Sequence, residues 1–235
     1  MRFSHMRHMM KKHLLFAAAA ASVFILGAGA SAMAQSVAPT APAALQPASL
    51  SGGQREAAIA AANAGLNSFQ RLQGRFTQIG PDGSRVGGSF AIQRPGKLRF
   101  EYDGPQSMII VSDGRVVHMR DRALRQTERQ PLDATPLALI LAENVDLERS
   151  ARVTRVERTS GALLVSARPR SGVADGEITL RFDPQGRNLL AWEIIDAAGG
   201  RTRIILQDVT QPASLDRGLF RLPDIIEDRR GGRPG

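Results

Sequence analysis

From about residue 74 onward, apolar and polar side chains alternate along the chain with a period of two. Residues 97–103 read KLRFEYD and residues 177–183 read EITLRFD. Successive side chains of a β-strand point to opposite faces of a sheet, so this alternation is typical of strands with one buried and one exposed face. The pattern therefore predicts a mainly β protein, and it limits helices to the few segments that lack the alternation.

Turn signals separate the alternating runs at short intervals. They include PDG at 81–83, DGP at 103–105, DG at 113–114 and DPQG at 183–186. Such sequences favour tight connections between antiparallel neighbours. About ten short strands in sequence predict a long antiparallel meander, and a meander of this length must curl.

Two segments have helical rather than strand periodicity. Ser51 can cap a helix from about Gly53 to Phe69, whose apolar residues recur every three to four positions. Thr135 and Pro136 are a suitable N-cap and first-turn pair for a second, short helix that continues from 137 to 141. This second helix is apolar on nearly every side and must be covered. We therefore predict that it plugs the concave face of the curled sheet or forms a lid over it.

The inward-facing positions of the predicted strands are large and apolar. They can form a packed core, or they can line a cavity for an apolar ligand, and both alternatives fit the pattern. An open sheet with only two short helices has little else to fill it, which makes the cavity the more specific hypothesis. The candidate lining residues are Phe76, Phe90, Ile92, Leu98, Phe100, Ile109, Val117, Leu180, Phe182, Trp192 and Ile194.

The first 34 residues have the three parts of a secretory signal. A basic start without acids precedes an apolar stretch from 14 to 30, and Ala32-Met33-Ala34 offers small residues for cleavage after Ala34. The alternative is a membrane anchor, although about 17 residues is the short limit for spanning a bilayer. We then expect a flexible Pro/Ala-rich leader at 35–50, one domain at 51–224 and a disordered tail at 225–235.

The composition argues against most kinds of chemistry. The chain has no cysteine, which excludes disulfides and thiol catalysis. His118 is the one histidine beyond the signal, and no G-x-S-x-G motif occurs. Cleavage after Ala34 would remove four basic residues and lower the formal net charge from +9 to +5. The arginines alternate with acids and do not form a basic stripe with interleaved aromatics. We expect no enzyme, cofactor, metal site or nucleic-acid partner.

The most distinctive local motif is QRPGKLRFEY at 93–102. It follows FTQ at 76–78, precedes VSDG at 111–114, and is followed by the apolar helix near 137–141. In this order and spacing, the motifs resemble the outer-membrane lipoprotein carrier (LolA) family. The resemblance runs from about Ser51 to Pro223.

This resemblance implies an incomplete antiparallel β-barrel with a helical lid over an apolar cavity. It implies a periplasmic, monomeric carrier that takes acylated lipoproteins from an inner-membrane lipoprotein-releasing transporter to an outer-membrane acceptor or the membrane surface. It also implies that Arg94 fastens the lid, to which Pro136, Leu137, Ile140 and Leu141 belong. The alternative is an envelope interaction or sensor module on the same fold that binds a lipid or protein ligand without transporting it.

Overall fold

The computed structural model describes residues 47–104, 108–124, 126–170 and 176–222. The predicted signal, most of the leader and the predicted tail lie outside the described residues. Within them, twelve strands form one antiparallel sheet in the order β1-β8-β9-β10-β11-β12-β2-β3-β4-β5-β6-β7. The strands are β1 Ala48–Ser49, β2 Arg71–Ile79, β3 Arg85–Gln93, β4 Lys97–Tyr102, β5 Met108–Asp113, β6 Val116–Asp121, β7 Gln126–Pro131, β8 Ala151–Thr159, β9 Ala162–Pro169, β10 Glu177–Phe182, β11 Leu189–Ile195 and β12 Arg201–Thr210.

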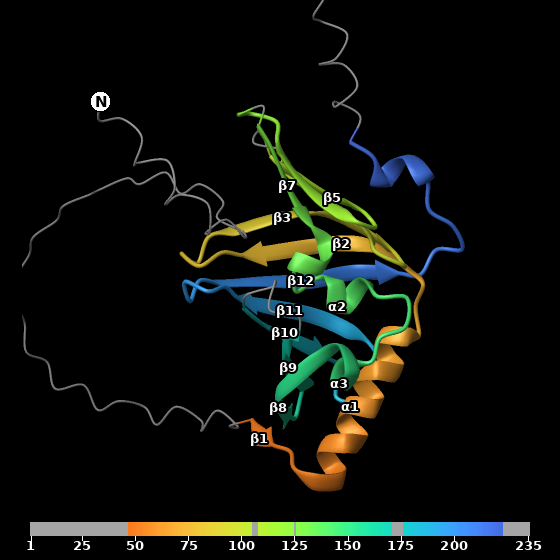
Figure 1. Ribbon diagram of the computed structural model, residues 1–235, viewed down its shortest axis with the longest axis vertical. Coiled ribbons are helices and arrows are strands. Elements are labelled where there is room, and N and C mark those ends of the chain that lie inside the picture. The colour runs from red at the N-terminus through yellow and green to blue at the C-terminus, as the bar shows by residue number, and fades with distance from the viewer. Residues whose placement is uncertain (1–46, 105–107, 125, 171–175, 223–235) are drawn as a thin grey trace, which may run out of the picture.

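The sheet consists of two meanders joined along one seam. Strands β2 to β7 follow one another in space as in sequence, and so do β8 to β12, while β12 pairs with β2 to connect the two runs. The edge strands β1 and β7 are not paired with each other, so the sheet curls without closing (Figure 1). The predicted fold class, mainly β with an incomplete antiparallel barrel, is confirmed.

Three α-helices and two 3-10 helices accompany the sheet in the described residues. They are α1 Gly52–Asn67, α2 Ala138–Leu141, α3 Leu147–Ser150, η1 Leu132–Ala134 and η2 Arg217–Phe220. Figure 1 shows α1 running along one end of the strands, whereas α2 and η1 lie over the middle of the sheet, in front of β11 and β12. Helix α2 and η1 thus cover the concave face.

The strand register decides which side chains share this concave face. Phe100 of β4 lies opposite Phe90 of β3 and Ile110 of β5. In the other half, Leu180 of β10 lies opposite Val165 of β9 and Trp192 of β11. Directly paired residues point to the same face of a sheet, so these rows form one continuous apolar surface.

One predicted lining residue faces the other way. Ile109 is paired with Glu101 and Arg120, on the convex face, and Ile110 takes the inward position instead. Ile109 is nevertheless buried, and η2 lies against β4 and β5, with Arg99 donating a hydrogen bond to the Leu219 carbonyl. Residues 108–111 are four consecutive apolar residues, so the sequence has no alternation there from which to assign the face.

The first helix differs from its prediction at both ends. Ser51 is the N-cap residue of α1, but its side chain makes no capping hydrogen bond, and the helix ends at Asn67 instead of Phe69. The Ser68 hydroxyl donates to the Gly65 carbonyl and satisfies one of the free carbonyls at the helix end. The predicted apolar stripe is buried against the sheet through Ala58, Ile59, Ala62 and Leu66.

The last residues of the predicted leader pair with the sheet. Ala48 and Ser49 form β1 and pair with Arg158 and Glu157 of β8, and the Leu50 amide donates to the Val156 carbonyl. The segment from 48 to 50 therefore belongs to the sheet. Among the described residues, no helix has both the length and the apolar character needed to cross a bilayer.

A substitution in α1 tests how tightly the helix packs on the sheet. A Cβ at Gly65 would lie 2.1 Å from the Gly186 carbonyl oxygen, whereas a Cβ at Gly53 of the same helix meets nothing within 4 Å. We expect Gly65→Ala to lower the free energy of unfolding by about 1–3 kcal/mol through this clash. Gly53→Ala should leave it unchanged or raise it by up to about 1 kcal/mol. Urea denaturation measures both, and equal effects would show that the close approach at Gly65 is unimportant.

Candidate functional site

The segment that covers the concave face is shorter and more irregular than predicted. Helix α2 begins at Ala138, and Thr135 does not cap it, because the Thr135 hydroxyl donates backward to the Leu132 carbonyl. Pro136 precedes α2 and is buried. The side chains of Leu137, Leu139, Ile140 and Leu141 are all buried, so the segment is enclosed on nearly every side.

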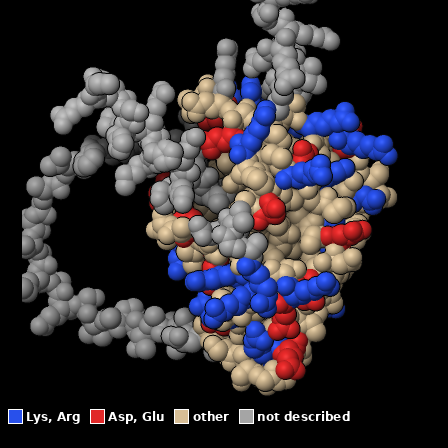
Figure 2. Space-filling model, viewed as in Figure 1, with Lys and Arg blue, Asp and Glu red and all other residues tan. Residues whose placement is uncertain are grey.

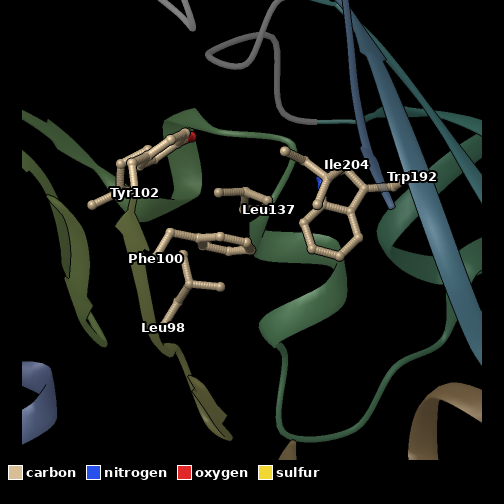
Figure 3. Close-up of a pocket in the computed structure, with 7 residues that line it drawn as sticks. Leu98, Phe100, Tyr102, Leu137, Trp192 and Ile204 are labelled. Atoms are coloured by element: carbon tan, nitrogen blue, oxygen red, sulfur yellow. The ribbon is translucent and has the colours of Figure 1, made fainter. Parts of the chain in front are cut away.

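Beneath this segment the interior is almost filled by side chains. Ten of the predicted lining residues belong to one buried cluster, Ile109 being the exception, and the cluster also contains Leu137, Ile140 and Leu141 of the covering segment. Three of the ten, Leu98, Phe100 and Trp192, line a small cavity. The full lining of this cavity is Leu98, Phe100, Tyr102, Ile110, Leu137, Trp192 and Ile204 (Figure 3).

The cavity is too small for a long acyl chain. About 240 Å³ of space not filled by atoms lies there, the part open to solvent included. The part of this space that is wide enough for a water molecule holds about one of them. Pockets that hold drug-sized ligands have volumes of about 300–1,000 Å³. Both alternatives left open by the sequence are therefore partly realised: the lining residues pack as a core, and a small gap remains where Leu137 meets the sheet.

Aromatic rings form the centre of the lining. The Phe76 ring meets Phe100 and Tyr102 edge-on, with centroids 4.6 and 5.0 Å apart. Phe100 in turn stacks with Phe90 and meets Trp192 edge-on at 6.0 Å. Such pairs contribute stability beyond the burial of their area, and they favour fixed ring orientations. Figure 3 shows Leu137 directed at this group, with Phe100 on one side and Ile204 and Trp192 on the other.

Arg94 joins the covering segment to the end of α1. Its Nε donates to the Ile140 carbonyl at 2.9 Å, and its Nη1 donates to the Leu66 carbonyl. The guanidinium also lies over the Phe69 ring, 4.1 Å from its centroid. These carbonyls stand at the ends of α1 and α2, where helices leave acceptors unsatisfied and where a cation is favourable.

The charge of Arg94 is held in an unusual environment. The residue is 4% exposed, and the described residues place no carboxylate against it. Burial lowers the pKa of Arg94 to about 10, so the guanidinium still carries its charge at neutral pH. Its Nη2 has no hydrogen-bond partner among the described residues. The hydrogen bonds of the Arg94 guanidinium to these carbonyls are strong because the donor is charged. Burying the cation without a counter-charge is costly, however, and this cost makes the contact easier to displace.

A second contact, which sequence reasoning missed, fastens the same segment. The Gly96 amide donates to the Leu141 carbonyl at 2.8 Å, and the Ser112 hydroxyl donates to the Gly96 carbonyl at 2.6 Å. Gly96 has a φ of +72°, a conformation that favours glycine. The turn from Arg94 to Gly96 thus places two donors against consecutive carbonyls of α2. One is the Arg94 side chain, and the other is the Gly96 backbone amide.

Two asparagines of α1, also missed, hold the chain that follows α2. The Asn67 side chain accepts from the Val145 amide and donates to the Val145 carbonyl, and Asn63 accepts from the Leu147 amide. Asn63 and Asn67 are four positions apart and so lie on one side of the helix. That spacing can be read from the sequence, but the backbone groups that the two side chains bind cannot. The two asparagines therefore hold the C-terminal end of the covering segment, and the hydrogen bonds from Arg94 and Gly96 hold α2 itself.

One polar pair interrupts the apolar lining. The Tyr102 hydroxyl donates to Gln78 Oε1 at 2.5 Å, and both residues are buried. Burial raises the pKa of Tyr102 far above its ordinary value, so the hydroxyl keeps its proton. The pair places hydrogen-bonding groups at the wall of an otherwise apolar cavity.

The rest of the described surface offers no other arrangement for chemistry. His118 Nε2 lies 3.9 Å from Asp113 Oδ2, without a nucleophile beside it, and the described residues contain no group of three potential metal ligands. Basic side chains gather over α3 and β8 (Figure 2), but acids lie among them, as in the pairs Arg55–Glu148 and Arg168–Glu177. The concave face is thus the candidate functional site.

The described residues define a class of architecture, which is an open antiparallel sheet whose apolar concave face is covered by a short helical segment held by hydrogen bonds. Comparison with known proteins agrees. The family model described as "Outer membrane lipoprotein carrier protein LolA" matches residues 67–223. The chain belongs to this family.

Individual relatives carry the same description. The chain is 34% identical to the outer-membrane lipoprotein carrier protein of Methylibium petroleiphilum over 155 residues, which are 62% of this chain and 74% of the relative. It is 32% identical to that of Methylococcus capsulatus over 178 residues, 70% and 85% of the two chains. A solved LolA-superfamily protein from Nitrosomonas europaea matches 72% of this chain and 97% of its own at 9% identity, with a TM-score of 0.44.

The buried polar pair gives a prediction for this site. Tyr102→Phe removes the hydroxyl and leaves Gln78 Oε1 without its donor, so we expect the free energy of unfolding to fall by about 1–3 kcal/mol. Removing both polar groups in Gln78→Leu/Tyr102→Phe should restore most of the loss, because no unsatisfied group is then buried. Chemical denaturation of the three proteins tests this. A double variant no better than Tyr102→Phe would contradict the pairing.

Proposed function

We propose that this protein is a periplasmic carrier that takes up the acyl chains of lipoproteins beneath the α2 segment and passes them on toward the outer membrane. The family assignment supports a lipoprotein carrier role. The observation that carries the finer proposal is the attachment of an apolar segment over an apolar concave face by Arg94 and Gly96. Its partners would be acylated lipoproteins, an inner-membrane releasing transporter and an outer-membrane acceptor.

The filled interior agrees with a carrier in its empty, closed state. Leu137 and its neighbours occupy the place that hydrocarbon would take, so binding requires that they leave. The exchange conserves apolar contact, because acyl chains replace leucine and isoleucine side chains against the same rings. What is lost on opening is chiefly the hydrogen bonds of Arg94 and Gly96 to the carbonyls of Ile140 and Leu141.

The strength of those hydrogen bonds suits a reversible closure. A hydrogen bond to a charged group contributes about 1.5–3 kcal/mol, which changes an open–closed equilibrium about 10- to 100-fold. Each buried methylene contributes about 0.8 kcal/mol, so a long acyl chain gains more than ~10 kcal/mol on full burial. The ligand can therefore displace the segment, and the tendency to close again opposes the bound state.

The same magnitudes require direct transfer. Several fully buried chains would approach the practical limit of noncovalent affinity, near ~20 kcal/mol, and release into water would then be extremely slow. A carrier whose lid competes with the acyl chains for the same site holds the chains less tightly than a carrier without a lid. The cargo can then move to an acceptor that has no such lid, by contact between the two proteins.

Removing the Arg94 contact should uncouple binding from release. We expect Arg94→Leu to take up lipoprotein but to release it to an acceptor or membrane at a rate about 10- to 100-fold lower, because the closed empty state is no longer favoured. The measurement follows transfer of a radiolabelled lipoprotein from carrier to outer-membrane vesicles. Arg75→Leu, which loses the same charge from an exposed ion pair with Asp103, is the matched control.

Normal transfer by folded Arg94→Leu protein would contradict this role of Arg94. Binding without any transfer by the unaltered protein would favour the alternative, a sensor module on the same fold.

Opening of the segment can be observed directly, because the chain has no cysteine of its own. We expect the thiol in Leu137→Cys to react slowly with a thiol reagent and at least about 10-fold faster after addition of a synthetic acylated lipopeptide, since reactivity follows the open population. Ala167→Cys, buried on β9, is the control and should stay unreactive. Equal protection of residue 137 with and without lipopeptide would rule out displacement of the segment.

A further inference from the structure

Trp192 stands out among the residues that line the cavity. It is the single tryptophan of the chain and is 2% exposed, yet its Nε1 has no hydrogen-bond partner among the described residues. A buried indole normally satisfies its N–H, because an unmet donor loses the hydrogen bond that water would give it. The residue therefore carries a polar group that the closed protein does not use.

The surroundings of the indole explain why it has no partner. Its neighbours across the strands are Leu180 and Ile204, and Phe100 meets the ring edge-on. These side chains offer no acceptor. They do fix the ring, and Figure 3 shows the ring nitrogen turned toward Ile204 and the interior of the cavity. The donor is thus held in a set orientation at the wall of the space that Leu137 partly fills.

We propose that Trp192 Nε1 donates a hydrogen bond to the carbonyl oxygen of an acyl chain bound in the cavity, so that the site recognises the acyl linkage as well as the hydrocarbon. This inference rests on the proposed acyl-binding function. An indole N–H can only donate, and the acceptor of an acylated ligand is the carbonyl oxygen of its ester or amide. Displacement of Leu137 would open the space beside the ring.

The lining also selects among ligands that have a carbonyl. Apart from Trp192 and Tyr102, the residues around the cavity are apolar, and none of them is a lysine or arginine. A free fatty acid that placed its carboxylate beside Trp192 would bury it without a counter-charge, because Arg94 lies at the ends of α1 and α2 and not in the cavity lining. Burying a carboxylate in this way is far costlier than burying a neutral carbonyl. The chemistry of the site therefore favours esterified or amide-linked chains over free acids and over ether-linked alkyl chains.

The test compares two synthetic lipopeptides of equal chain length, one with ester-linked acyl chains and one with the same chains in ether linkage. We expect the purified protein to bind the ester about 3- to 10-fold more tightly than the ether, the range that one net hydrogen bond provides. In Trp192→Phe, which keeps an aromatic ring but lacks the N–H, the preference should fall to about 1. Ile204→Val removes a methylene group from the same cavity wall and leaves every donor in place. It should lower the affinity for both ligands alike and keep the preference for the ester.

The unaltered protein provides a second readout that needs no variant. Because Trp192 is the one tryptophan, its fluorescence reports this site alone. Hydrogen bonding at the indole nitrogen moves emission to longer wavelength, so the ester should give a red shift relative to the ether at saturation. Equal emission together with equal affinity would overturn the inference while leaving acyl binding intact. Failure of both lipopeptides to bind would instead overturn the proposed function, and this inference with it.

Discussion

The structure depends on one constraint, which is that the concave face of an open apolar sheet must be kept from water. The two meanders joined at the β12–β2 seam curl without closing, and so they leave a large apolar surface uncovered. Burial of apolar area is the dominant favourable term in folding. A chain with few helical residues has little material for this task, and the apolar side of α1 and the four-residue helix α2 with its flanking turns supply the cover. The α2 segment is consequently part of the core, and in the proposed function it is also the part that moves.

The way this segment is held follows from its composition. Its side chains are apolar and make no specific polar contact, so its attachment is through backbone carbonyls. Arg94 and the Gly96 amide meet consecutive carbonyls of α2, and Arg94 also reaches the end of α1. A guanidinium has several donors in a fixed plane, which allows one side chain to bind two helix ends together. In the proposed function, release of the segment would break these hydrogen bonds and leave the strand pairing of the sheet intact.

The polar groups within the lining modify an otherwise uniform surface. Gln78 and Tyr102 satisfy each other, whereas the Trp192 N–H and Arg94 Nη2 have no partner among the described residues. Unsatisfied buried donors are uncommon in folded proteins and often mark functional positions. These two donors lie on the sheet wall and at the attachment of the segment, which are places that a ligand entering beneath α2 would meet. In the proposed function, these donors would meet a ligand that is mainly hydrocarbon with a few acceptors.

The sequence by itself determined the fold class and most of the inward face. Strict alternation in β4 and β10 assigned Leu98, Phe100, Leu180 and Phe182 to the correct side, because a strand's period of two leaves no other choice once one face is buried. Tertiary structure decided what alternation could not. It placed Ile109 on the convex face within an unbroken apolar run, moved the start of α2 to Ala138, and brought Asn63 and Asn67 to the chain that follows α2. It also decided how full the interior is, since packing depends on side chains that meet across the curved sheet from positions far apart in sequence.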